Sequence, residues 1–164
     1  AGDTQAMLLL AAGGAQGDFP GIADGAWQRW LQRAADAGHP RAMGMLGSRL
    51  LEGNGFARDE ATARHWLQRA SNEGDTQAAY NLGLAHQYGR GGPVDIAAAI
   101  TAYRRAAANG SVEARLNLGA LLMGDPSGQA EARRLMELVA AGPDRELAAI
   151  ARENLDELDW RQRP

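Results

Sequence analysis

The sequence predicts an all-α protein in which pairs of helices stack along one axis, an α-solenoid. The first observation is an internal repeat, because related segments return at a constant step of 36 residues along the chain. The second is composition: 21 of the 164 residues are glycine and alanine is abundant, whereas aromatic residues make up only 5%. Small side chains in these amounts favour closely packed helices, and the scarcity of valine, isoleucine and threonine argues against sheets.

Two families of segments carry the repeat. The first consists of 6-AMLLLA-11, 42-AMGMLG-47, 78-AAYNLG-83 and 114-ARLNLG-119. The second consists of Trp30-Leu31-Gln32-Arg33-Ala34, Trp66-Leu67-Gln68-Arg69-Ala70 and the weaker Ala102-Tyr103-Arg104-Arg105-Ala106, followed at the same step by Gly38, Gly74 and Gly110. We therefore predict one domain over residues 1–164, with repeats at about 4–38, 39–74, 75–110 and 111–142 and a terminal helix at 144–160.

The first two blocks each contain two helices separated by an inner loop. In the first block, a long glycine-rich loop at 13–25 separates the opening helix from the helix that contains Trp30. In the second block, Pro40 fits the first turn of the opening helix, where its missing N–H is not needed. The glycine-rich turn 53–55 ends this helix, and Asp59 is placed to cap the next one.

The third and fourth blocks follow the same plan with different inner turns. Asp75 and Asp95 are placed to cap the two helices of the third block, and the glycine-rich turn 89–93 separates these helices. Ser111 caps the fourth block, in which a shorter turn at 124–128 removes four residues from the repeat. Terminal repeats are often atypical because they cover the open end of the stack, and the segment 144–160 is predicted to complete that cover.

Three glycines fall inside predicted helices at the same position of the repeat: Gly47, Gly83 and Gly119. A glycine in a helix costs about 0.5–1 kcal/mol relative to alanine. Because this cost recurs in register, we expect a neighbouring helix to approach closely at each of these glycines.

The combined pattern resembles the Sel-one-like repeat (SLR) family, a relative of the tetratricopeptide repeat (TPR). It consists of Ala-x-x-x-Leu-Gly, a glycine-rich inner turn with a following Asp, Trp-Leu-x-x-Ala and a closing Gly, and it covers roughly residues 4–142. The first block departs with Leu10-Ala11, and the fourth lacks the aromatic residue of the second helix. The resemblance implies a right-handed α-solenoid of about four SLR/TPR-like helix pairs plus a C-terminal capping helix. It also implies a scaffold for protein partners, many of them in bacterial secretion, signalling and envelope systems.

Charge and cysteine content exclude several kinds of partner and site. Acidic residues outnumber basic ones by only 20 to 17, which gives no electrostatic case for nucleic acid or an anionic membrane. The absence of cysteine excludes disulfides and thiolate metal sites. No run of 18 apolar residues exists, so no membrane span is expected. The chain begins at Ala1 rather than Met, and we expect a periplasmic or exported protein, with a cytoplasmic one as the alternative.

The residues that could carry chemistry do not form a recognisable constellation. His39, His65 and His86 occupy three different positions of the repeat, so the repeat geometry does not bring them together. No metal-binding His-x-x-x-His pair or Gly-x-Ser-x-Gly elbow is present. The segment Gly89-Arg90-Gly91-Gly92 follows a helix and lacks the Gly-Lys-Ser/Thr ending of a phosphate loop. We therefore predict no catalytic residue, no metal site and no cofactor, and a protein that is not an enzyme.

The candidate binding residues lie on the first helices, which line the concave surface of a helix-pair solenoid. The register of related repeats places ten side chains there: Arg41, Ser48, Gln77, Tyr80, Leu84, Gln87, Tyr88, Glu113, Leu116 and Met123. Asn81 and Asn117 share a further register position and either hold an extended peptide by its backbone or brace a neighbouring turn. This surface is mixed, with few basic residues, so a folded partner or an apolar segment fits it better than a C-terminal carboxylate does. Trp160 either packs onto the terminal helix or offers a further anchor.

The function predicted from these observations is that of a noncatalytic protein–protein interaction module that binds a dedicated protein partner. The resemblance implies a bacterial adaptor or inhibitor linked to the envelope or to secretion, whose partner is a toxin or effector, a receptor or an envelope component. A narrower alternative is an immunity protein that neutralises a phospholipase effector of type VI secretion. A hydrolytic enzyme and a structural spacer of a larger protein are the competing classes. The oligomeric state is left open.

Overall fold

A computed structural model describes residues 4–16 and 26–161 of the chain, and all regular structure in these ranges is helical. The helices are α1 (Thr4–Gln16), α2 (Ala26–Asp36), α3 (Pro40–Glu52), α4 (Glu60–Asn72), α5 (Thr76–Gln87), α6 (Ile96–Ala108), α7 (Val112–Leu122), α8 (Gln129–Ala140) and α9 (Arg145–Arg161). The predicted all-α solenoid is confirmed. The prediction for the loop 13–25 was wrong at its start, because α1 continues through residues 13–16; residues 17–25 lie outside the described ranges.

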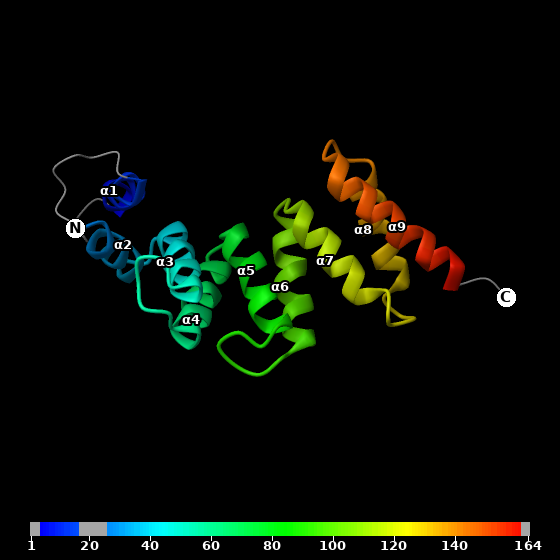
Figure 1. The fold of residues 1–164 in the computed structure, drawn as a ribbon, viewed down its shortest axis with the longest axis horizontal. Helices are drawn as coiled ribbons and strands as arrows, with labels where there is room; N and C mark the ends of the chain where they lie inside the picture. The colour runs from blue at the N-terminus through cyan, green and yellow to red at the C-terminus, as the bar shows by residue number, and fades with distance from the viewer. Residues whose placement is uncertain (1–3, 17–25, 162–164) are drawn as a thin grey trace.

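The helices succeed one another along the long axis of the molecule, with α1 and α9 at opposite ends (Figure 1). Contacts are extensive within the pairs α1–α2, α3–α4, α5–α6 and α7–α8, and also between each pair and the next. The first helices α3 and α5 touch directly. The terminal helix α9 packs against both α7 and α8, so it occupies the place that the first helix of a further repeat would take.

The predicted caps form at the starts of four helices. In each case a side-chain oxygen accepts a hydrogen bond from the backbone N–H three residues later, at 3.0 Å for Asp59, 2.7 Å for Asp75, 2.9 Å for Asp95 and 3.1 Å for Ser111. A cap of this kind satisfies one of the backbone N–H groups that the first turn of a helix leaves without a partner. The block-closing glycines Gly38, Gly74 and Gly110 have φ values of 84°, 90° and 100°, which a side chain rarely allows.

The core between the two layers of helices is rich in alanine and consists of two clusters of buried residues, both of which include residues of α5 and α6. Its largest fully buried side chains are Leu31, Met43, Leu46, Leu67, Tyr103, Leu118, Met136, Val139 and Leu158. They are distributed over all four helix pairs and α9, so every repeat contributes apolar side chains to the core, as expected of a solenoid.

The helical glycines admit large side chains from the second helix of the same pair. A Cβ atom added at Gly47 would lie 2.8 Å from Cγ of Leu67, and one added at Gly83 would lie 2.4 Å from Cε1 of Tyr103. In the fourth repeat, a Cβ at Gly119 would lie 2.6 Å from the terminal methyl of Met136. Such distances are too short for carbon atoms, which confirms the predicted close approach.

We expect the substitution Gly83→Leu to lower the free energy of unfolding by about 3 kcal/mol or more, because the new side chain must displace the fully buried ring of Tyr103. Chemical denaturation followed by circular dichroism measures the change. Ala120→Leu is the matched control, since this alanine is exposed on α7 and follows Gly119 directly. An unchanged melting temperature for Gly83→Leu would contradict the packing account.

Candidate functional site

We call the exposed surface of the first helices α3, α5 and α7 the first-helix face. Its N-terminal part is a hollow of about 620 Å³ between α3 and α5. Arg41, Ser48 and Gln77 line this hollow, as the repeat register predicts, together with Glu52 and the cap residue Asp75. The hollow thus brings together acidic, basic and neutral polar groups rather than groups of one charge.

Asn81 fixes the wall of this hollow. Its side-chain amide donates a hydrogen bond to the Ser48 hydroxyl at 2.8 Å and accepts one from the Gln77 amide at 3.1 Å. The Ser48 hydroxyl in turn donates to the carbonyl of Gly44 at 3.0 Å. Of the two roles predicted for Asn81, this geometry corresponds to the brace, because the amide already joins α5 to α3.

The middle of the first-helix face carries a cluster of three tyrosines. The rings of Tyr80 and Tyr103 contact each other with centroids 5.9 Å apart. The Tyr103 hydroxyl donates to Gln87 at 2.7 Å and accepts from Asn117 at 3.5 Å. The structure therefore brings Tyr80, Gln87 and Asn117 together around a hydroxyl that comes from the second helix α6.

The same cluster includes Tyr88. Burial is the main cause that raises the pKa of Tyr80 and of Tyr103 above the usual value, and the nearby Tyr88 adds to the increase in both. The phenols of Tyr80 and Tyr103 are thus neutral hydrogen-bonding groups near pH 7. The Tyr88 side chain keeps 65% of its surface exposed, which makes it the most accessible aromatic group of the cluster.

The remaining predicted residues have different environments. Leu84 is half-buried against the core, whereas Glu113 is exposed and accepts a hydrogen bond from the Ser111 hydroxyl at 3.0 Å. The prediction that Leu116 and Met123 present apolar surface was wrong, because they are only 8% and 6% exposed. Both belong to the core that α7 shares with α8 and α9.

The reason for this burial can be seen two repeats earlier. Leu116 corresponds to Gly44, where an added Cβ would lie 3.2 Å from Cβ of Ala78 on the next first helix. This repeat position can therefore lie against the following first helix, and in the fourth repeat α9 packs against α7 in the place of that helix. Trp160, near the end of α9, is 70% exposed and does not pack into the terminal helix.

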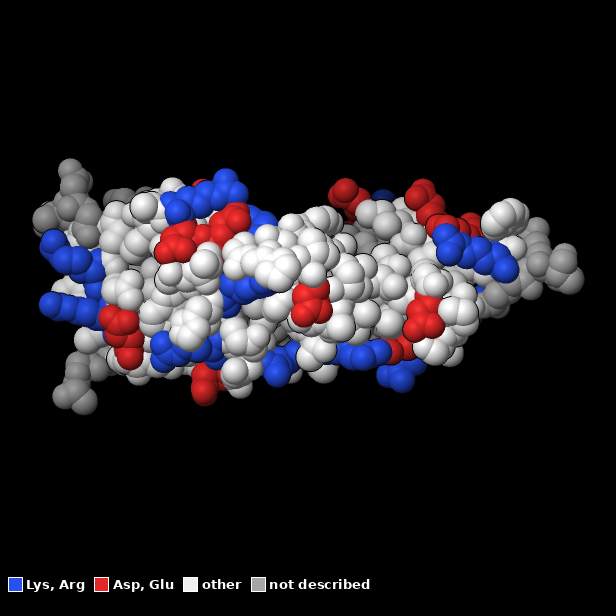
Figure 2. Space-filling view, turned by 90° about the horizontal axis from the view of Figure 1, so that it is seen from below, with Lys and Arg blue, Asp and Glu red and all other residues white. Residues whose placement is uncertain are grey.

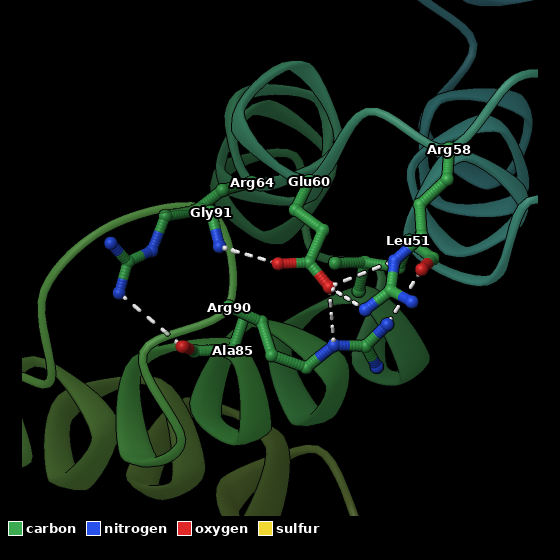
Figure 3. Close-up of polar contacts among 7 residues, drawn as sticks. All are labelled: Leu51, Arg58, Glu60, Arg64, Ala85, Arg90 and Gly91. Carbon is green, nitrogen blue, oxygen red and sulfur yellow. Dashed lines mark hydrogen bonds and ion pairs between the residues drawn. The ribbon is translucent and has the colours of Figure 1, made fainter.

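The inner loop between α5 and α6 is anchored to the preceding repeat by Glu60 at the start of α4 (Figure 3). The Glu60 carboxylate accepts hydrogen bonds from the Arg90 guanidinium and from the Gly91 N–H, each at 3.2 Å, and pairs with Arg58. Arg90 also donates to the carbonyl of Leu51 at 2.6 Å. Hydrogen bonds from Arg58, and then from Arg90, lower the pKa of Glu60, so the carboxylate stays charged.

A second anchor lies beside the first. The Arg64 guanidinium donates to the carbonyl of Pro93 at 3.2 Å and lies 2.8 Å from Nδ1 of His86. A Cβ added at Gly91 would lie 2.1 Å from the carbonyl oxygen of Glu60, so only glycine lets the loop approach α4 this closely. Together the two anchors hold residues 89–93, directly after Tyr88, against the neighbouring repeat.

Sequence reasoning missed Tyr103 and the residues of these anchors. Tyr103 corresponds to Leu67 in the preceding repeat, and a hydroxyl at a position that is otherwise aliphatic was the available signal. For the anchors, the signal was Arg90 in a turn whose counterpart at 53–55 contains no basic residue.

The described residues contain no group of three His, Cys, Asp or Glu side chains that could hold a metal ion. No helix within residues 4–16 and 26–161 is long and apolar enough to cross a membrane. Seen from the side of the inner loops, acidic and basic side chains are interspersed along the molecule without a large area of one sign (Figure 2).

Helix pairs in register, helical glycines at the pair contacts and a first-helix face define a helical-repeat protein of the α-solenoid class. The chain belongs to the Sel1 repeat family: the family model for the Sel1 repeat matches residues 28–39, 40–75 and 76–111. The two complete matches begin one residue after the repeats predicted at 39–74 and 75–110. A comparison with curated proteins gave no match.

Solved structures with the same architecture include a Sel1 repeat protein from Oxalobacter formigenes, which is 35% identical, with a TM-score of 0.67 over 71% of this chain and 88% of that one. A protective antigen of uropathogenic Escherichia coli strains, which displays an SLR fold, is 30% identical with a TM-score of 0.76. That match covers 83% of this chain but only 30% of the antigen. Cysteine rich protein B of Helicobacter pylori shares the fold at 19% identity, with a TM-score of 0.56 over 68% of this chain and 85% of that one.

We expect the stability of the protein to fall as the pH is lowered through the range just below 6.5, because His86 is held in its neutral form. Burial and then the charge of Arg64 lower the pKa of His86, against an opposing effect of Asp95. The unfolded chain, with an ordinary pKa near 6.5, therefore binds the proton first, and stability rises with pH across this window. Denaturant titrations between about pH 5 and about pH 7.5 measure the slope.

His86→Gln keeps an acceptor for Arg64 but does not titrate, so it should flatten this slope. His65→Gln, on the exposed side of α4, is the control and should keep it. Equal slopes for the wild type and for His86→Gln would contradict the assignment.

Proposed function

We propose that this protein is a noncatalytic interaction module that binds a dedicated protein partner with its first-helix face. Sel1 repeat proteins are generally protein-interaction modules and typically scaffolds without catalysis. The observation that carries the proposal for this chain is the exposed ring of Tyr88 next to the supported ring of Tyr80. Tyr80 lies in the N-terminal half of α5, and Tyr88 directly follows the last residue of this helix.

An exposed tyrosine is a strong binding group when its position is already fixed, because little conformational freedom is lost on binding. The backbone N–H of Tyr88 donates to the Leu84 carbonyl at 3.0 Å, and the loop that follows is held by Glu60 and Arg64. The ring of Tyr80 rests on the buried ring of Tyr103. These contacts support a preorganised aromatic surface for an apolar part of the partner.

The hollow between α3 and α5 supports a polar second part of the same interface. Arg41 and Gln77 are exposed at its rim, and Glu52 adds a negative charge. Since Asn81 and Ser48 are already bonded to each other, the partner would meet the rim residues rather than these two. The mixed charges fit a folded surface with complementary polar groups, and a nucleic acid is not expected to bind them.

The finer role that we propose is that of an adaptor or inhibitor in a periplasmic or exported system, with a toxin or effector, a receptor or an envelope component as the partner. A match to a protective antigen of a pathogenic bacterium supports a bacterial setting, although this chain spans only about 30% of that antigen. Within this role, an immunity protein would abolish the phospholipase activity of its toxin on binding, whereas an adaptor would leave the partner active. Purified partner activity with and without the chain separates the two.

We expect the double substitution Tyr80→Ala/Tyr88→Ala to weaken partner binding by at least about fivefold, or about 1 kcal/mol, because aromatic anchors dominate interface energies. The partner is the protein that the wild-type chain captures from extracts of the native host in stoichiometric amount. Its affinity for the wild type and the variants is then measured by calorimetry.

Circular dichroism must show that the double variant is folded. Gln68→Ala, on the exposed side of the second helix α4, is the control and should bind like the wild type. If the tyrosine variant bound with unchanged affinity, the first-helix face would not be the binding surface.

A further inference from the structure

The second helices form a series of grooves on the other face of the solenoid, and two of these grooves correspond residue by residue. The groove between α4 and α6 is lined by Gln68, Ser71, Leu82, Thr101 and Arg105, among others. The groove between α6 and α8 has a volume of about 310 Å³ and is lined by Arg104, Leu118, Glu131, Arg134 and Leu138, among others. From α4 to α6 and from α5 to α7 the step is 36 residues, so Gln68 corresponds to Arg104 and Leu82 to Leu118.

The shorter inner turn of the fourth repeat changes the step between α6 and α8. Tyr103 and Met136, which make the same contact with a helical glycine, are 136 − 103 = 33 positions apart. With this step Thr101 corresponds to Arg134, and Arg105 corresponds to Leu138. The two grooves are therefore the same structural site with different side chains.

In the first of these grooves, Arg105 forms a cross-brace between the second helices. Its guanidinium donates to the Ser71 hydroxyl at 3.0 Å and to the Asn72 side chain at 2.7 Å. Ser71 is almost completely buried, so its hydroxyl depends on this partner. The guanidinium of Arg105 thus spans the groove by hydrogen bonds to two side chains of α4.

The second groove lacks every member of this cross-brace. Alanine replaces the two acceptors, at Ala107 and Ala108, and Leu138 replaces the arginine. The Leu138 side chain is 50% exposed, and Leu118 lies beneath it in the core. What remains is a groove with an aliphatic base, in which the ion pair between Arg104 on α6 and Glu131 on α8 is the link between the second helices among the described residues.

Three arginines surround this aliphatic base, against one acidic residue. Arg104 is already paired with Glu131 through two hydrogen bonds, at 3.0 and 2.6 Å. Within residues 4–16 and 26–161, the guanidinium groups of Arg115 and Arg134 form no ion pair or hydrogen bond, although Arg134 helps to lower the pKa of Glu131 after the larger effect of Arg104. The rim therefore carries two positive charges that no acidic group of the groove neutralises.

From this comparison we infer that the groove between α6 and α8 is a second binding site, for an acidic amphipathic segment of a protein partner. An aliphatic side chain of the segment packs on Leu138 and Leu118, and its carboxylates pair with Arg115 and Arg134. The volume lies at the lower end of the range for ligand sites, which fits one or two side chains of a short segment rather than a cofactor. This site uses a different face from the tyrosine cluster and does not depend on the function proposed above.

The test is a titration of the 15N-labelled full chain with the capped peptide acetyl-Glu-Leu-Glu-Leu-Glu-amide, followed by amide chemical shifts. We expect saturable shifts at Leu118, Leu135 and Leu138, and none at Ser71 or Thr101 in the braced groove. Raising the salt concentration from about 50 to about 300 mM should weaken binding, because the rim charges are exposed to solvent. The peptide with Gln in place of Glu should bind at least about tenfold more weakly.

Two protein variants make the test specific. Arg115→Gln/Arg134→Gln removes the rim charges and should weaken binding at least about tenfold. Ala107→Ser/Ala108→Asn/Leu138→Arg rebuilds the cross-brace in the second groove and should abolish binding, while circular dichroism and the melting temperature show a folded protein. The inference is overturned by an absence of saturable shifts at millimolar peptide, by equal binding of the Gln peptide, by shifts confined to the first-helix face, or by a response to anionic vesicles without one to the peptide.

Discussion

The architecture depends on one contact that recurs in the pairs α3–α4, α5–α6 and α7–α8: a helical glycine of the first helix receives a large side chain of the second. Leu67, Tyr103 and Met136 fill this position in successive repeats, and none of them leaves room for a Cβ atom opposite. Because the glycine removes the side chain between the helices, the two backbones come close enough to form one rigid unit. Stacking such units brings the first helices to one face and the second helices to the other.

With the pair contact held constant, the differences between repeats lie at positions where one pair meets the next. The same register position is Gly44, Tyr80 and Leu116 in three successive first helices, and at Gly44 it lies directly against the following first helix. Glycine there lets the helices touch, tyrosine adds a ring to the surface, and leucine joins the terminal core. A residue at an equivalent position can therefore be buried in one repeat and exposed in another without altering the fold. Candidate binding sites are found where the residues of one repeat differ from those at the same positions of the other repeats.

The sequence predicted the helix pairs, their caps and the glycine contacts, because these depend on local chemistry and on a period that can be counted. It did not predict the burial of Leu116 and Met123, which requires α9 to take the place of a further first helix. Nor did it choose between the two roles of Asn81, since Ser48 is 33 residues away and only the curvature of the stack brings them together. The structure thus agrees with the predicted helix pairs more closely than with the predicted set of exposed residues.

The tyrosine cluster shows how the core and the surface are coupled. Tyr103 can lie flat against α5 only because Gly83 has no side chain, and its hydroxyl then reaches Gln87 and Asn117. Burying a hydroxyl without a hydrogen bond costs folding free energy, and Tyr103 is fully buried. The hydrogen bonds to Gln87 and Asn117 therefore stabilise the core and fix the positions of these two amides. The ring of Tyr103 in turn supports Tyr80. The absence of a side chain at Gly83 therefore determines where Tyr103 lies, and Tyr103 determines where the ring of Tyr80 lies. The fold requires these contacts whether or not a partner is present.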